Sequence, residues 1–270
     1  MKILDIKIDS IKKTDALAKI EQFLDSDSPH QIATVNAEFI LESQKNNEFK
    51  EILNNSDLNL ADSVSMQWAA TLNNAKLTQI PIFRSIQAIL IYKIAGAAII
   101  FNKNYISKII PERISGADLI WDIAKLAEEK KTKIFLLGGR DSVAEFTASK
   151  LVEKYPKLII AGTSEANPEQ DITDEIKKTG AKIIFVAYGA PKQEIWISNN
   201  LAKTGAKVGI GVGGTFDFIA GKAKRAPKFI RSIGLEWLWR LILQPSRIKR
   251  IYNAFIKFSF IVLITKIKEK

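Results

Sequence analysis

The sequence predicts an α/β protein with a Rossmann-like, mostly parallel sheet flanked by helices. Apolar runs of strand length recur along the 270 residues, and a helical pattern follows nearly every run. The runs consist almost entirely of Ile, Val, Leu and Phe, as expected of strands that are buried on both faces. Strands of this kind, alternating with helices, form a parallel sheet that is covered by helices on each side.

Each strand is predicted from an apolar run bounded by polar or glycine-containing segments. The strands are expected at Ile3–Ile8, Gln31–Val35, Leu58–Ala61, Lys133–Leu137, Leu158–Gly162, Lys182–Ala187 and Lys207–Val212. The intervening helices are expected at Thr14–Leu24, Ala37–Leu53, Ser63–Leu72, Ser142–Lys154, Asp171–Lys178 and Pro191–Leu201. Because such sheets bind ligands beyond the carboxyl ends of their strands, the residues that follow each strand are the first candidates for a site.

The C-terminal part of the chain carries the whole net charge of +11. Residues 222–270 contain 13 Lys or Arg and two Glu, whereas residues 1–221 contain 27 basic and 27 acidic side chains. Apolar and aromatic residues are interleaved with these charges, which is typical of amphipathic helices in a lipid interface; nucleic-acid binders usually keep a polar basic face. We therefore predict a core domain, 1–221, and a basic amphipathic helical appendage, 222–270, that binds an acidic membrane surface and no nucleic acid.

Composition excludes several kinds of chemistry. The chain has no Cys, which excludes thiol catalysis and disulfides, and its single His cannot form a multi-histidine metal site. The first nine residues alternate polar and apolar side chains and lack the basic and apolar regions of a signal peptide. The expected location is therefore the cytoplasm, peripheral on the inner face of the cell membrane.

Glycine-containing loops follow three of the predicted strands. Glycine lets backbone amides approach a ligand closely, and a following helix directs free N–H groups at a phosphate. Each loop alone is better explained by the geometry of a strand-to-helix turn, but the three loops together predict a pocket for a nucleotide diphosphate. Neither GxxxxGK[ST] nor GxGxxG occurs at a strand end, which argues against a P-loop NTPase and a standard dinucleotide dehydrogenase. The candidate binding residues in these loops are Gly138, Gly139, Gly189, Lys192, Gln193, Gly213, Gly214 and Asp217.

Asp62 is the candidate general base. It is a charged residue directly after the buried run Leu58–Ala61, a position where a charge indicates a specific role. The alternative is that it caps a helix starting at Ser63, a role that is compatible with catalysis. The segment Asp25–Asp27 matches the metal-binding DxD pattern of many sugar transferases. It lies at the end of the first predicted helix, however, and is interpreted as a solvated turn.

Seven motifs occur in a characteristic order, and the similarity that they mark covers nearly the whole chain except for about 30 residues after Asn74. The motifs are Thr34–Glu38, Ala61–Ser65, Phe135–Gly139, Gly189–Glu194, Gly211–Asp217, Lys224–Pro227 and Gly234–Leu238. On these motifs the chain resembles the WecG/TagA/CpsF-type bacterial glycosyltransferases, glycosyltransferase family 26. Members of that family include the N-acetylmannosaminyltransferase of wall teichoic acid synthesis.

The resemblance implies an inverting glycosyltransferase that needs no metal or other cofactor. The implied donor is a UDP-sugar, of N-acetylmannosamine or a related N-acetylhexosamine or hexuronic sugar. The implied acceptor is an undecaprenyl-diphosphate-linked sugar in the synthesis of a cell-surface polysaccharide or teichoic acid. Inversion requires one base to deprotonate the acceptor hydroxyl, and Asp62 matches the proposed catalytic aspartate of the family. Thr34 matches a residue beside it, and Asn36 and Gln193 match polar positions that line the pocket.

The same resemblance implies that arginines of the appendage neutralise the leaving UDP. Arg240, Arg247 and Arg250 fall at the matching positions, and a planar guanidinium pairs well with phosphate oxygens. The alternative is that each is one more basic residue of a lipid-facing helix. The family also suggests a homo-oligomer in solution, with the appendage docking over the pocket only at the membrane.

The chain departs from the family pattern in two places, and these limit which family properties can be expected of it. Val35 stands at the usual proline, and Ser63 and Ser65 stand at the usual glycines, so that a narrower pocket and a different donor sugar are expected. The second departure is an apolar insertion at about 77–110, whose uncharged runs are shorter than the roughly 20 residues that span a bilayer. We interpret it as a helical hairpin or in-plane helix that touches lipid near the acceptor entrance. The alternative is an extra packed helix pair or an oligomer contact.

Two other functions compete with glycosyl transfer. A nucleotide or nucleic-acid binding protein without catalysis would use the same sheet and basic appendage but has no use for a lone carboxylate at a strand end. A hydrolase of nucleotide sugars would release free sugar without a lipid acceptor.

Overall fold

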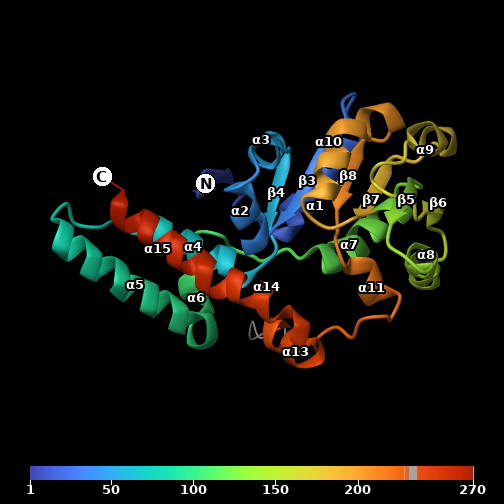
Figure 1. Cartoon of the computed structure of the whole chain (residues 1–270). Helices are drawn as coiled ribbons and strands as arrows, with labels where there is room; N and C mark the ends of the chain where they lie inside the picture. The colour runs from blue at the N-terminus through green and yellow to red at the C-terminus, as the bar shows by residue number, and fades with distance from the viewer. Residues whose placement is uncertain (228, 231–235, 270) are drawn as a thin grey trace.

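The computed structural model describes residues 1–227, 229–230 and 236–269, without the side chains of Arg240 and Arg247. Its centre is a six-stranded, all-parallel sheet with helices on both faces (Figure 1). The predicted fold class is therefore confirmed. The strand order is β4-β3-β8-β7-β5-β6. The strands are β3 (His30–Val35), β4 (Leu58–Ala61), β5 (Lys133–Gly138), β6 (Ile159–Ser164), β7 (Ile183–Ala187) and β8 (Val208–Gly211).

The first predicted strand, Ile3–Ile8, is wrong. Residues Lys2–Ile3 (β1) and Ile6–Lys7 (β2) form a small antiparallel hairpin of their own, outside the main sheet. The chain reverses at Leu4 and Asp5, which have φ angles of 45° and 67°. Their left-handed backbone is what breaks the alternating pattern into two short pieces.

The helices divide between the two faces of the sheet. One face carries α1 (Lys13–Leu24), α7 (Gly116–Glu129), α8 (Val143–Lys154) and α11 (Thr215–Ile219). The other carries α2 (Ala37–Ser43), α3 (Asn47–Asn55), α4 (Val64–Asn73), α9 (Thr173–Thr179) and α10 (Lys192–Thr204). The helix predicted over Ala37–Leu53 is two helices, because Asn46 caps α3 by accepting a hydrogen bond from the amide of Phe49 at 3.0 Å.

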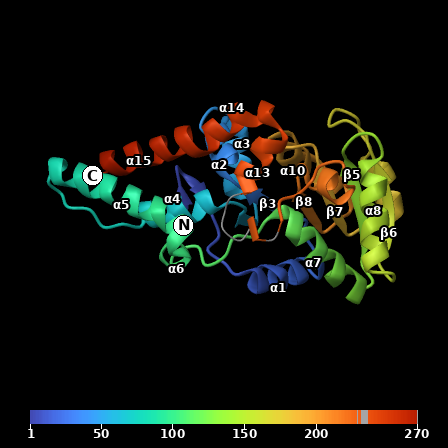
Figure 2. The ribbon, with the colours of Figure 1, turned by 90° about the horizontal axis from the view of Figure 1, so that it is seen from below.

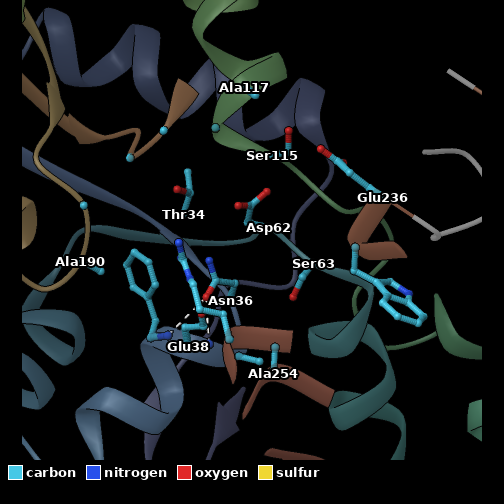
Figure 3. Close-up of a pocket in the computed structure, with 18 of the residues that line it drawn as sticks. Thr34, Asn36, Glu38, Asp62, Ser63, Ser115, Ala117, Ala190, Glu236 and Ala254 are labelled. Atoms are coloured by element: carbon cyan, nitrogen blue, oxygen red, sulfur yellow. Dashed lines mark hydrogen bonds and ion pairs between the residues drawn. The ribbon is translucent and has the colours of Figure 1, made fainter. Parts of the chain in front are cut away.

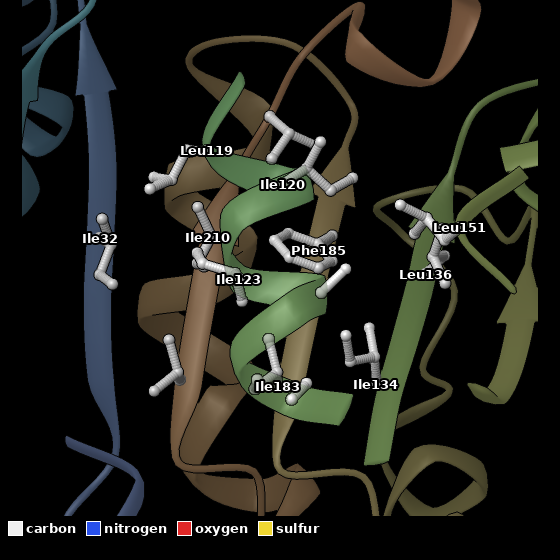
Figure 4. Packing of buried hydrophobic residues seen from close by; sticks show 14 of the residues in the cluster. Ile32, Leu119, Ile120, Ile123, Ile134, Leu136, Leu151, Ile183, Phe185 and Ile210 are labelled. Carbon is white, nitrogen blue, oxygen red and sulfur yellow. The ribbon is translucent and has the colours of Figure 1, made fainter. Parts of the chain in front are cut away.

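Alternate residues of each central strand supply the cores on the two faces. In β5, Ile134 and Leu136 pack on the α7 side, whereas Phe135 and Leu137 pack under α9 and α10. Figure 4 shows α7 crossing the strands, with its Leu119, Ile120 and Ile123 against the sheet. This burial on both sides explains why the strands read as continuous apolar runs.

The predicted insertion contains one long helix, α5 (Pro81–Phe101), followed by the short α6 (Lys103–Ile106). It is not a hairpin within itself, because Arg84 and Lys93 do not interrupt the helix. By length and composition alone, α5 is apolar enough to cross a membrane, and only 17% of its most apolar window is buried. The expectation that this segment is too short to span a bilayer was therefore wrong. It was based on the length of the uncharged runs, whereas the helix continues through Arg84 and Lys93.

The C-terminal segment consists of helical pieces that run from the sheet's carboxyl edge to α5. They are α13 (Glu236–Leu243), a 3-10 turn (Pro245–Arg247), α14 (Ile248–Tyr252), a π-helical turn (Asn253–Lys257) and α15 (Phe258–Lys268). Helices α5 and α15 lie side by side and extend away from the sheet (Figures 1 and 2); we call this pair the arm. Phe258 and Val262 of α15 are fully buried in the same cluster as Met66 of α4. The division at residue 221 into core domain and appendage stays a prediction.

Candidate active site

A pocket of about 900 Å³ opens at the carboxyl edge of the sheet. Residues after β3, β4, β7 and β8 line it, and the C-terminal segment closes one side (Figure 3). The chain leaving β3 enters α2 on one face, whereas the chain leaving β8 enters α11 on the opposite face. The pocket therefore lies at the topological switch point of the sheet, where α/β proteins bind their ligands.

Asp62 lies in this pocket, one residue beyond the end of β4. Its backbone amide donates to the carbonyl of Val35 at 2.9 Å, which fixes the residue beside the end of β3. Its carboxylate points into the pocket, between Thr34 and Ser115 (Figure 3). The capping alternative is wrong, because α4 begins at Val64 and the residue at its N-cap position is Ser63.

Thr34 and Asn36 lie on either side of the end of β3. The Thr34 hydroxyl donates to the carbonyl of Gly211 at 3.2 Å, which joins β3 to the end of β8. The Asn36 side-chain oxygen caps α2 by accepting from the amides of Glu38 and Phe39 at 2.9 and 3.3 Å. Its amide NH₂ is thus the part of the side chain that can donate to a substrate.

Arg225 brings a permanent positive charge close to Asp62. Its two terminal nitrogens contact the two carboxylate oxygens of Asp118 at 2.7 and 2.8 Å, and one of them also donates to Ser115 at 3.1 Å. Burial acts to lower the pKa of Arg225, but hydrogen bonding to Asp118 and the charges of Asp118, Glu236 and Asp62 raise it overall. The guanidinium therefore stays charged, and it fixes the segment after α11 to the start of α7.

Gln193 joins two of the glycine loops. Its side-chain oxygen accepts from the amide of Gly189 at 3.0 Å and from the amide of Gly213 at 2.9 Å. Its side-chain NH₂ donates to Glu194 at 2.7 Å, which fixes the amide in this orientation. Both residues are buried, and a β-carbon at Gly211 would lie 2.4 Å from each of their side chains. The arrangement holds the loops after β7 and β8 at a fixed separation.

Glu194 gives the fold a pH dependence that can be measured. Burial raises its pKa to about 8 from the ordinary 4.5, against the opposing effect of its hydrogen bond with Gln193. Between pH 4.5 and about pH 8, Glu194 is therefore protonated in the folded protein but ionised in the unfolded chain. The free energy of unfolding consequently falls as pH rises through that range. We expect Glu194→Gln to remove this decline in urea unfolding curves recorded from pH 5 to pH 9.

The exposed Glu175, for which Glu175→Gln is made in parallel, is the matched control and should leave the decline in place. Parallel pH curves for the wild-type protein and Glu194→Gln would show that Glu194 is ionised in the fold.

Arg250 of α14 forms a two-pronged ion pair with Glu38 at the start of α2. The Nε atom lies 2.8 Å from one carboxylate oxygen and Nη2 lies 2.5 Å from the other. The hydrogen bonds to Glu38 raise the pKa of Arg250. Both residues line the pocket, as do Ala254 and Lys257 from the following turn. The ion pair thus fastens the C-terminal segment to the pocket rim.

The structure brings together most, but not all, of the residues predicted for the site. Gly138 and Gly139 do not line the pocket, because β5 lies two positions from β8 in the sheet and Gly139 packs on Val143. Lys192 does not line the pocket either; its Nζ atom lies 3.7 Å from a carboxylate oxygen of Glu169. The side chains of Arg240 and Arg247 lie outside the described part of the chain. The predicted residues that line the pocket are Thr34, Asn36, Asp62, Gly189, Gln193, Gly213, Gly214, Asp217 and Arg250.

Several pocket residues were missed by the sequence analysis. Glu38, Arg225 and Glu236 belong to three of the seven motifs, and their charge within those motifs was the available signal. Arg113 and Ser115 line the pocket from the stretch between the insertion and α7. None of the seven motifs lies in that stretch, and α7 itself was not among the predicted helices.

The parallel sheet, with glycine loops and a carboxylate at its carboxyl edge, defines an α/β protein that binds its ligand at the switch point of the sheet. Comparison with known protein families identifies the kind of α/β protein, because residues 1–93 and 82–270 match the Glycosyl transferase WecG/TagA/CpsF family. The chain belongs to this family, so the predicted resemblance is confirmed. It is therefore a glycosyltransferase of cell-surface polysaccharide synthesis, a family that uses a sugar-nucleotide donor and a lipid-linked acceptor. The two matched segments overlap within α5.

Proposed function

We propose that this glycosyltransferase moves a sugar from a UDP-sugar, with inversion, onto a sugar linked to undecaprenyl diphosphate, with Asp62 as the general base. The observation that carries the proposal is the Asp62 carboxylate, which points into a large pocket at the switch point of the sheet. A volume of about 900 Å³ is within the range of pockets that hold ligands of this size. The donor is proposed to be UDP-N-acetylmannosamine or a related N-acetylhexosamine or hexuronic sugar nucleotide.

In the proposed step, the carboxylate of Asp62 accepts the proton of an acceptor hydroxyl as the hydroxyl oxygen attacks the anomeric carbon of the donor. The bond between that carbon and the oxygen of the β-phosphate breaks, and UDP leaves with the electron pair. Attack from the face opposite UDP inverts the anomeric centre. One base is sufficient for this single displacement.

The leaving UDP gains negative charge. We propose that arginines, and not a metal ion, neutralise this charge. Arg113 and Arg250 line the pocket, and guanidinium groups pair with phosphate oxygens in two-pronged geometry. Arg250 contacts Glu38 in the same geometry that a phosphate would use. A bound diphosphate would therefore compete with Glu38 for this guanidinium.

The test is a screen of UDP-sugars with an undecaprenyl-diphosphate-GlcNAc analogue in detergent, read by mass spectrometry. We expect one UDP-sugar to add a single sugar to the acceptor, with the same yield in the presence of EDTA. Free sugar formed at the same rate without acceptor would instead identify a nucleotide-sugar hydrolase. Loss of transfer on adding EDTA would refute the metal-free mechanism.

A further inference from the structure

The arm carries an exposed apolar surface that the proposed reaction does not use. Helix α5 has 21 residues, so at 1.5 Å per residue it is roughly 30 Å long. Its exposed side is a stripe of large apolar side chains at helical spacing, with Ile82 68%, Leu90 55% and Phe101 84% exposed. We call this set the α5 stripe; it consists of Ile82, Phe83, Ile86, Leu90, Ile94 and Phe101.

The fully buried residues of α5 are all small, namely Ala88, Ala95 and Ala98. The larger Ile91, Tyr92 and Ile99 are half-buried and pack against the core cluster beside them. A helix on the surface of a water-soluble domain directs its large apolar residues inward. Small residues between helices and large residues outward is instead the pattern of helices that contact lipid.

The arm holds the α5 stripe in a fixed orientation. The Tyr92 hydroxyl of α5 lies 3.1 Å from the Ser259 hydroxyl of α15, and the Tyr92 ring packs edge-on against Trp68 of α4 at 5.2 Å. Phe258 of α15 packs against the same Trp68 ring. Because one side of α5 is fastened to the α/β core in this way, the helix cannot be surrounded by lipid. Its exposed side alone is available to a bilayer.

The charges around the stripe are mostly positive. Residues 77–111 and 237–268 contain no Asp or Glu, and Glu269, which follows α15, is paired with Lys266. Lys93 lies on the exposed side of α5, and Lys103, Lys257 and Lys268 are exposed on neighbouring elements. A second copy of the chain docked on this surface would bring like charges together, whereas acidic lipid headgroups complement them. A lysine in mid-helix also favours a helix lying in the interface, where its ammonium can reach the headgroups.

We propose that α5 lies in the plane of an acidic bilayer, with the α5 stripe in the acyl region and the lysines at the headgroups. The neighbouring turn Asn253–Lys257 both lines the pocket and leads into α15. Lipid contact at the arm therefore holds the pocket beside the membrane surface. The value of placing the pocket there rests on the proposed function, because only a lipid-linked acceptor requires a pocket at the membrane.

The absence of cysteine makes a direct test possible in the full chain. Leu90→Cys is labelled with the fluorophore NBD and mixed with vesicles of equal parts phosphatidylglycerol and phosphatidylcholine. We expect the emission to shift to the blue and to be quenched by nitroxides on the acyl chains. The matched control is Phe146→Cys on α8, which is also 55% exposed in the wild type but lies far from the arm (Figure 1). Its label should stay in water.

A second variant tests the stripe without a label. Ile86→Gln/Leu90→Gln/Ile94→Gln should weaken vesicle binding by about tenfold or more, whereas Phe146→Gln/Ile159→Gln should not. Transfer to a water-soluble acceptor analogue, measured on the same variant, should be retained, so failure of the lipid contact and failure of the proposed reaction are distinguishable. A label at position 90 that stays in water while the protein binds vesicles would overturn the proposal. Burial of that label by rising protein concentration without vesicles would overturn it in favour of a second copy.

Discussion

Asp62→Asn is expected to lower turnover by about a hundredfold or more, the range for loss of a general base, while leaving UDP affinity nearly unchanged. Asparagine keeps the size of the side chain but cannot accept the proton of the acceptor hydroxyl. The residue is held by its backbone hydrogen bond to Val35, which the substitution leaves intact. Turnover is measured with the UDP-sugar identified in the screen, and UDP affinity is measured by calorimetry.

The matched control is Asp25→Asn, in the segment that matches the DxD pattern. Asp25 is exposed at the end of α1, ahead of β3, whereas the pocket lies beyond the other end of that strand. It should therefore have no effect on turnover. If Asp25→Asn abolished transfer and Asp62→Asn did not, the base would have been assigned to the wrong edge of the sheet. If UDP bound but neither protein turned over any donor, the non-catalytic binding alternative would be favoured.

Phe258→Ala is expected to lower the free energy of unfolding by about 3–5 kcal/mol, the usual cost of removing a fully buried aromatic ring. Phe258 is 0% exposed and lies in the cluster that contains Met66 and Trp68 of α4. The loss would be measured by urea unfolding in the absence of lipid.

Phe260→Ala serves as the control, because Phe260 is on the same helix and is 60% exposed. Its expected effect is within about 0.5 kcal/mol of zero, as for most surface substitutions. Equal effects of the two substitutions would mean that α15 does not pack against α4 in solution.

The packing of Phe258 also changes how a deletion of the C-terminal segment must be interpreted. On charge and composition, removing residues after about Gly221 should release the protein from acidic liposomes. In the structure the same deletion uncovers the apolar faces of α4 and α5, because Phe258 and Val262 cover them. Point substitutions in the α5 stripe separate membrane binding from this loss of the core.

The sheet could be predicted from the sequence because its strands are buried on both sides. The strands around Ile134 and Ile183 are buried at nearly every position, as central strands of a parallel sheet are, so they read as continuous apolar runs. The β1–β2 hairpin could not be predicted in the same way. Its residues alternate like a strand, and only the backbone at Leu4 and Asp5 breaks that strand into two.

The site was predictable where a residue follows a strand directly, and less so where distant segments meet. Asp62 and Gly213 follow β4 and β8, so strand prediction alone places them at the carboxyl edge. The pairing of Glu38 with Arg250 joins residues that are 212 positions apart, and no local pattern encodes it. Gly138 was selected by the same local rule as Gly213, but its distance from the pocket depends on strand order, which the rule does not contain.

The pairing of α5 with α15 has a consequence for synthesis of the chain. More than 150 residues separate the end of α5 from the start of α15. On the ribosome, α5 therefore emerges long before α15, and the part of its buried side that α15 covers stays exposed until α15 has been synthesised. A nascent chain in this state exposes apolar surface on both sides of one helix, which makes it a target for chaperones or for early capture by the bilayer.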